Sequence, residues 1–97
     1  MARIEVTPIP DAGYNPDIID FARWAVEEYN RVHQTSLKFM RVFFAGQEIP
    51  SDGPERSYTI TLEAVKNFLN IGEYKAEVRV QPNAKKLVGF TNIIPPA

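Results

Sequence analysis

The sequence predicts a single α+β domain, residues 1–97, in which one long helix packs across a curved antiparallel sheet of four to five strands. Three observations support this prediction. The chain has 97 residues, of which 44% are hydrophobic and 24% charged, as in an ordinary globular domain. One stretch near the N-terminus has the apolar spacing of a helix. Strand-forming segments precede and follow it, and an antiparallel sheet built from them would carry the helix on its apolar face.

The helix is expected to run from Pro16 to about His33. Asn15 can cap its first turn, and proline is well suited to the first helical position. Asp17 and Asp20 would lie near the positive end of the helix dipole. Steps of four and three residues place a set of apolar side chains on one face, which we expect to be buried. These are Ile18, Ala22, Ala25, Tyr29 and Val32, with Ile19, Phe21 and Val26 beside them.

The strands are predicted from alternation of apolar and polar side chains. Their expected ranges are residues 3–8, 37–45, 58–64, 74–80 and 86–93. In the second range the apolar side chains change from odd to even positions, which predicts a bulge that bends the strand. The expected connections are a turn at residues 11–14, a loop at 46–54, an unusually apolar link at 66–72 and a turn at 82–85.

Composition argues against several classes of function. Eleven basic and twelve acidic side chains are interspersed, so we expect neither a nucleic-acid partner nor a membrane surface. The chain has no cysteine, which excludes disulfides, thiolate nucleophiles and cysteine metal ligands. No apolar run approaches the ~20 residues of a membrane span, and the first residues do not resemble a signal peptide. We expect a soluble protein, with cytoplasmic and secreted locations both open.

The side chains that could carry chemistry do not form a catalytic or metal-binding motif. His33 is the only histidine, and a histidine near a helix C-terminus is explained by the helix dipole. The serines lack a motif for nucleophilic catalysis, and there is no glycine-rich phosphate loop. We therefore expect no enzyme activity, no catalytic residue, no metal and no cofactor. Trp24 is expected in or beside the core, and Lys85 with Lys86 in a solvated turn.

Four segments resemble the cystatin family. Residues 21–30, FARWAVEEYN, resemble the helix signature of plant cystatins. The segments LKFMRV, YTITLEA and YKAEVRV, which begin at residues 37, 58 and 74, are similar to the second, third and fourth strands of the family. The resemblance covers about residues 3–93 and implies the cystatin fold. Residues 86–96 are also similar to monellin, a sweet-tasting plant protein with that fold.

The resemblance implies reversible inhibition of papain-like cysteine proteases. In cystatins a glycine near the N-terminus, a first hairpin loop and a Pro-Trp turn together fill the protease cleft. The positions here that correspond to the loop and the turn are Gln47, Glu48, Ile49, Pro50, Ser51, Asp52, Gly53, Pro82 and Asn83. The resemblance thus implies a papain-like cysteine protease as partner. The inhibitor is expected to be a monomer, while the long first loop leaves a domain-swapped dimer open.

This sequence departs from the cystatin pattern in all three pieces. Only Met1 and Ala2 stand where the family glycine is expected, and Gly13 follows the first strand. Glu48 and Asp52 add charges to the first loop, and burying either one in a cleft would cost several kcal/mol. Asparagine replaces the tryptophan of the second turn. The alternative hypothesis is therefore a non-inhibitory cystatin-fold protein with a binding, structural or taste-active role, as in monellin.

Overall fold

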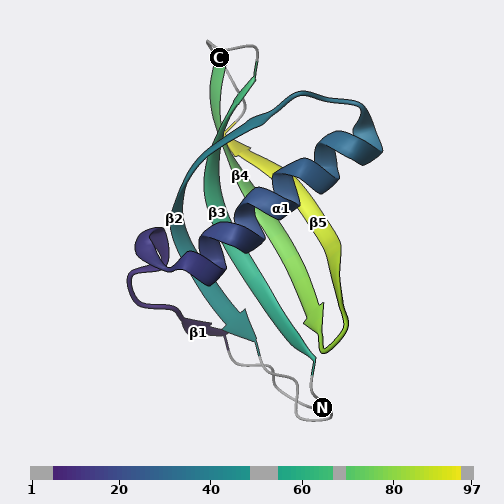
Figure 1. Ribbon diagram of the computed structural model, residues 1–97. Helices are drawn as coiled ribbons and strands as arrows, with labels where there is room; N and C mark the ends of the chain where they lie inside the picture. Colours follow the sequence, from purple (N-terminus) through teal and green to yellow (C-terminus); the bar gives the residue numbers. More distant parts are fainter. Residues whose placement is uncertain (1–5, 49–54, 67–69, 95–97) are drawn as a thin grey trace.

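The computed structural model describes residues 6–48, 55–66 and 70–94, and in them one α-helix crosses one face of a five-stranded antiparallel sheet (Figure 1). The elements are β1 (Val6–Pro8), the 3-10 turn η1 (Ala12–Tyr14), α1 (Pro16–His33), β2 (Lys38–Glu48), β3 (Arg56–Lys66), β4 (Asn70–Gln81) and β5 (Ala84–Ile94). The strands lie in chain order, and each neighbouring pair is antiparallel. The predicted α+β class and the cystatin-like arrangement are confirmed. Within the described ranges, no helix has the length and apolar content that a bilayer crossing needs.

The helix begins and ends where the local sequence signals place it. The Asn15 side-chain oxygen accepts hydrogen bonds from the backbone N–H groups of Asp17 at 3.0 Å and Ile18 at 3.3 Å. These bonds satisfy donors that the first helical turn leaves without partners. Gln34 follows the last turn in the left-handed conformation, with φ of 55°, and its N–H reaches the carbonyl of Asn30. Both predicted bounds of the helix are therefore confirmed.

The core lies between the inner face of α1 and the centre of the sheet. Ile18, Ala22, Ala25 and Val26 are buried on the helix. The sheet side chains buried in the same cluster are Leu37, Val42, Ala45, Ile60, Leu62, Ala64, Tyr74, Ala76 and Val78. Alanine at two of the four helix positions lets the helix backbone lie close to the strands, and dense packing of this kind leaves little room for larger side chains.

The prediction that Val32 is buried is wrong, since 58% of the residue is exposed. The helix crosses the sheet diagonally, and its C-terminal turns extend beyond the sheet on the β5 side (Figure 1). Val32 there lines a groove between α1 and β5. Helical periodicity gives the direction of a side chain, but the length of the sheet beneath the helix decides whether that side chain is covered.

Strand β2 bends around the helix through two irregularities in its pairing with β3. The register shifts between Phe39 and Arg41 and again between Val42 and Phe44. Each shift adds one residue to β2 that has no partner on β3, which is the geometry of a bulge. The bulge predicted from the change of parity is thus confirmed, and the strand contains a second one. It leaves Met40, Phe43 and Phe44 about half exposed while Val42 stays in the core.

The Asn30 side chain connects the end of α1 by hydrogen bonds to Leu37, the residue directly before β2. Its side-chain amide donates to the carbonyl of Leu37 at 2.8 Å, and its side-chain oxygen accepts from the N–H of Leu37 at 2.9 Å. The same oxygen accepts the hydroxyl hydrogen bond of Thr35 at 2.8 Å. These bonds fix the turn between the helix and the sheet, and they use a side chain that lies outside the buried stripe.

The strands are longer than predicted at several ends. Gly46, Gln47 and Glu48 belong to β2, whereas the sequence placed them in a loop. Lys66 ends β3, and residues 70–72 begin β4, so only residues 67–69 of the apolar link lie outside the described part. The β5 strand also begins earlier, at Ala84. Hydrogen bonds to the neighbouring strands extend these strands into segments that are rich in turn-forming residues. The composition of such a segment does not show which strands will lie beside it.

Candidate functional site

The strand ends next to the predicted protease-binding segments form one edge of the sheet. The pairing register joins Val6 of β1 to Glu48, Glu48 to Ser57, Ser57 to Arg79, and Arg79 to Lys86 of β5. Beyond this row lie the end of β2, the start of β3 and the turn between β4 and β5. We call this row of strand ends, which runs across all five strands, the strand-end edge. It differs from the lateral edges of the sheet, which are the strands β1 and β5.

The structure divides the predicted first loop into two parts. Gln47 pairs with Tyr58 and Thr7, while Glu48 pairs with Ser57 and Val6, so both have strand neighbours on either side. Both residues are half-buried. Ile49, Pro50, Ser51, Asp52 and Gly53 lie outside the described residues. The register nevertheless places the point where the chain leaves β2 at the strand-end edge.

Pro82 and Asn83 make the turn that joins β4 to β5. The last pair of the ladder is Gln81 with Ala84, so these two residues form the shortest common hairpin connection. Both residues are exposed. Their position at the strand-end edge agrees with the expected place of the second turn, and the side chain presented there is a polar amide.

Charged groups on the outer face, the sheet face turned away from α1, surround the strand-end edge. Arg79 on β4 lies with its Nε 3.0 Å from a Glu55 carboxylate oxygen, and Lys75 lies 3.6 Å from Glu77. A shallow polar hollow of about 170 Å³ lies here. Its polar and charged lining is formed by Glu48, Ser57, Thr59, Lys75, Glu77 and Arg79. Because opposite charges are already paired, this face has no strong excess of either sign.

Two residues that the sequence treated separately lie together. The Lys85 ammonium nitrogen is 5.2 Å from the centre of the Trp24 ring and 5.9 Å from that of Phe21. Trp24 is half-buried and packs against the core, as expected. Lys85, however, is part of β5 and not of a turn. A turn at Pro82 and Asn83 puts Lys85 opposite Val80, on the sheet face that carries the core side chains of β4. This pairing is the signal in the sequence that could have placed Lys85 beside the helix.

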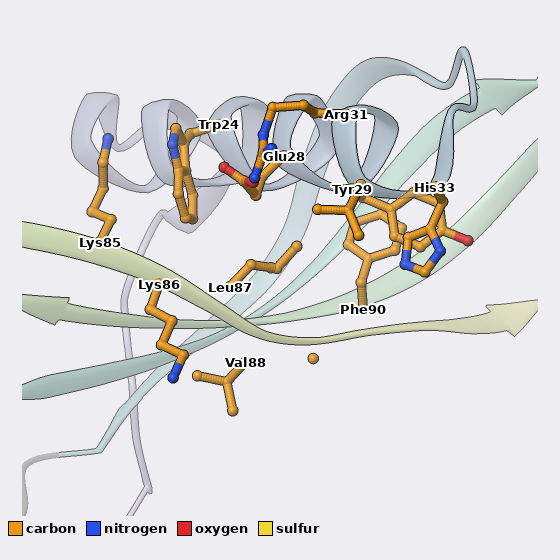
Figure 2. A pocket seen from close by; sticks show the side chains of 12 residues that line it. Trp24, Glu28, Tyr29, Arg31, His33, Lys85, Lys86, Leu87, Val88 and Phe90 are labelled. Carbon is orange, nitrogen blue, oxygen red and sulfur yellow. The ribbon is translucent and has the colours of Figure 1, made fainter.

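A groove separates the second half of α1 from β5 (Figure 2). It has a volume of about 530 Å³. Trp24, Glu28 and Arg31 lie on its helix side, whereas Leu87 and Phe90 lie on the β5 side (Figure 2). We call it the α1–β5 groove. Sequence reasoning missed it, because no motif joins residues from the helix with residues 50 or more positions later.

The aromatic side chains at the far end of the groove are stacked. Tyr29 lies 4.4 Å from Phe90 and 4.4 Å from His33, measured between ring centres, and Phe90 lies 5.2 Å from Tyr74. Burial raises the pKa of the Tyr74 hydroxyl above its usual value, and repulsion from Tyr29 raises it further. His33 contacts Tyr29 in a tilted arrangement. The described residues include no cluster of three or more acidic, histidine or cysteine side chains that could hold a metal ion.

Two curated relatives, one named as a cystatin and one as a cysteine proteinase inhibitor, are similar to most of the chain. Multicystatin from Solanum tuberosum is 38% identical over 73 residues, which cover 73% of this chain and 9% of that protein. Cysteine proteinase inhibitor 7 from Arabidopsis thaliana is 37% identical over 84 residues, which cover 81% of this chain and 33% of that protein. The chain thus spans a third or less of the length of these relatives. No family model matches it.

These two similarities support a cystatin-like family for this chain. One relative is named as a cystatin and the other as a cysteine proteinase inhibitor, and neither name is that of an enzyme. A solved structure, the designed influenza hemagglutinin binding protein HSB.2, is similar over 94% of this chain and 97% of its own. It is 22% identical with a TM-score of 0.42, and a likeness at that level supports no conclusion about fold or binding.

Proposed function

We propose that this chain is a cystatin-family domain that inhibits papain-like cysteine proteases reversibly, with the strand-end edge placed in the active-site cleft. The similarity to two plant proteins with cystatin or cysteine proteinase inhibitor names supports the family. The binding segments of the proposal are residues 47–53 together with Pro82 and Asn83.

One geometric observation carries the proposal. The paired row from Val6 to Lys86 brings the start of β1, the end of β2, the start of β3 and the β4–β5 turn to the same edge. Five strands at about 4.8 Å spacing make this edge about 19 Å wide. An edge of that width can enter a protease cleft and exclude substrate from it. Inhibition by exclusion needs no reactive group on the inhibitor, which agrees with the lack of a catalytic motif in the sequence.

The position of Glu48 lowers the cost of inserting this edge. The sequence alone suggested a carboxylate in the loop that enters the cleft, with a desolvation cost of several kcal/mol. In the structure Glu48 is a half-buried member of β2, paired with Ser57 and lining the polar hollow of the outer face. Its carboxylate therefore belongs to the flank of the proposed wedge, at the polar hollow that Lys75 and Arg79 also line.

A second candidate function is a binding module without protease inhibition. The exposed Asn83 favours it, because an amide stands where the family pattern has the aromatic anchor of the second turn. Aromatic side chains often contribute most to interface affinity. We therefore expect inhibition in the micromolar range and not the nanomolar range, a difference of about 4 kcal/mol in binding free energy.

The direct test is a titration of papain activity with the purified chain up to micromolar concentrations. We expect inhibition that is reversed by dilution and leaves the chain uncleaved by mass spectrometry. A matched pair of variants locates the contact. Asn83→Asp should weaken inhibition by adding a charge at the strand-end edge, whereas Asn92→Asp, near the opposite end of β5, should not. Equal effects of the two variants, or no inhibition by the unmodified chain, would refute the inhibitor proposal.

A further inference from the structure

The α1–β5 groove lies beside an edge of the sheet that has backbone groups available for pairing. Strand β5 is last in the strand order, and within the described ranges it pairs with β4 alone. It has 11 residues, whereas the strand at the opposite edge, β1, has three in the described part of the chain. An edge strand presents N–H and C=O groups that another extended chain can pair with. Lys85, Lys86 and Val88 are exposed along it.

The charges around the groove are mostly positive, although the chain as a whole carries a net charge of −1. On the helix side, Arg31 forms an ion pair with Glu28. On the strand side, Lys85 and Lys86 take part in none of the ion pairs among the described residues. The β4 residue opposite Lys86 is another cation, Arg79, which Glu55 neutralises. The two lysines therefore remain available to an anionic partner.

The rest of the groove is apolar. Leu87 and Phe90 are half-buried on β5, and Val32 is 58% exposed on the last turn of α1. Figure 2 shows Leu87 between the helix and the strand, with Trp24 on the side of Lys85 and Phe90 farther along. An added strand would send alternate side chains into this space. On the groove face its apolar side chains would contact Leu87, beyond Lys85, which lies on the same face opposite Val80. Its acidic side chains would lie on the other face, near Lys86, which is opposite Arg79.

We propose that the free edge of β5 and the α1–β5 groove bind an extended acidic peptide segment of a partner protein, which pairs with β5 as a further strand. A segment of about eight residues spans about 26 Å, enough to reach from the two lysines to beyond Phe90. The lysines disfavour a second copy of the chain as the partner. If two β5 strands paired with their lysine-bearing ends side by side, like charges would be adjacent. This site extends away from the strand-end edge and does not depend on protease inhibition.

The single tryptophan provides a direct measurement, because Trp24 lines the groove. The probe is a capped peptide of about eight alternating glutamates and valines, titrated while Trp24 emission is followed. We expect a saturable change in emission. A peptide of alternating lysines and valines should produce none, and the glutamate peptide with N-methyl groups on alternate amides should bind at least about tenfold more weakly, because it cannot complete the ladder.

A pair of double variants tests the charge contribution. Lys85→Glu with Lys86→Glu should weaken binding at least about tenfold. The control, Lys38→Glu with Lys66→Glu, changes the net charge equally on β2 and β3 and should bind as the unmodified chain does. Thermal melts verify that each variant is folded. Equal loss in both variants, or equal binding of the N-methylated peptide, would overturn the proposal.

Two further measurements exclude other occupants. A single-stranded oligothymidylate should not compete with the glutamate peptide, and tighter binding of the oligonucleotide would overturn the proposal in favour of a nucleic-acid site. Sedimentation velocity of the chain without peptide should show no association through this edge. A dimer that the Lys85→Glu and Lys86→Glu variant abolishes or strengthens would assign the edge to a second copy instead.

Discussion

Two regions of the molecule differ in how strongly packing restricts their side chains. One is the interface between α1 and the sheet, and the other is the strand-end edge. At the interface, Ala22 and Ala25 have no exposed surface, and among the residues that the structure describes no charged side chain belongs to the buried cluster. At the strand-end edge, Pro82 and Asn83 are exposed, and the nearby charges of Glu55 and Arg79 are paired in solvent. Dense packing restricts the interface to a few side chains, whereas the edge can change its chemistry at little cost in stability. A cystatin-like scaffold can therefore keep its fold while the side chains of the strand-end edge depart from the family pattern.

The largest expected effect is at the interface. Ala25→Asp places a charge in the core, so we expect a loss of at least about 3 kcal/mol in the free energy of unfolding. For a domain of this size, that loss lowers the melting temperature by at least about 12 °C. Glu27→Asp is the control, because it puts the same side chain on the exposed face of α1 and should cost under about 1 kcal/mol. A melting temperature of Ala25→Asp equal to that of the control would contradict the buried interface.

Asn30→Ala is expected to have the next largest effect. It removes three side-chain hydrogen bonds, one with Thr35 and two with Leu37, in the segment between α1 and β2. The backbone N–H and carbonyl of Leu37 then lack these partners. We expect a loss of about 2 kcal/mol in urea denaturation. Asn30→Asp keeps the two acceptor bonds and loses only the donor bond, so its loss should be smaller. If the two variants are equally destabilised, the acceptor bonds do not hold this turn.

Asn83→Trp tests the strand-end edge. It restores the aromatic side chain of the family pattern, and we expect papain inhibition to tighten about tenfold, or about 1.4 kcal/mol. Because the position is exposed, the free energy of unfolding should change by less than about 0.5 kcal/mol. Asn92→Trp, an exposed position near the other end of β5, should leave inhibition unchanged. An Asn83→Trp variant that inhibits no better than Asn92→Trp would place the protease contact elsewhere.

The smallest expected effect is on the pH dependence of stability. Burial, and then repulsion from Tyr29, raises the pKa of Tyr74 in the folded protein above the value of about 10 in an unfolded chain. The folded state thus holds the proton more tightly. This contribution to stability is complete below pH of about 10 and is lost as the pH rises through the folded pKa.

The measurement is the free energy of unfolding from pH 8 to above pH 11, at intervals. Tyr74→Phe should show a smaller decline above pH of about 10 than the unmodified chain, by at most about 1.4 kcal/mol per pH unit. Tyr14→Phe is the control, because Tyr14 is 86% exposed and should not alter the decline. A decline in Tyr74→Phe as steep as in the unmodified chain would show that another group causes it.

Local signals predicted much of the fold but little of the site. The bounds of α1 follow from Asn15 and Pro16 at one end and the apolar spacing along it, all within a few residues of the chain. The bulges of β2 follow from its own change of parity. The ends of the strands were less accurate, because Gly46 becomes part of β2 only through partners on β1 and β3. The structure places Gln47, Glu48, Pro82 and Asn83 at the strand-end edge, but their contact with a protease stays a prediction.

The sequence by itself determined the helix, the alternating strands, the lack of cysteine chemistry and the resemblance to cystatins, because each depends on the order and spacing of side chains. Only the tertiary structure decided that Val32 is exposed, that Lys85 lies over Trp24 and that β5 borders a groove. These features depend on how far the helix extends past the sheet and on which strand lies at its edge. Such relations join residues far apart in the chain, and packing of the whole core sets them.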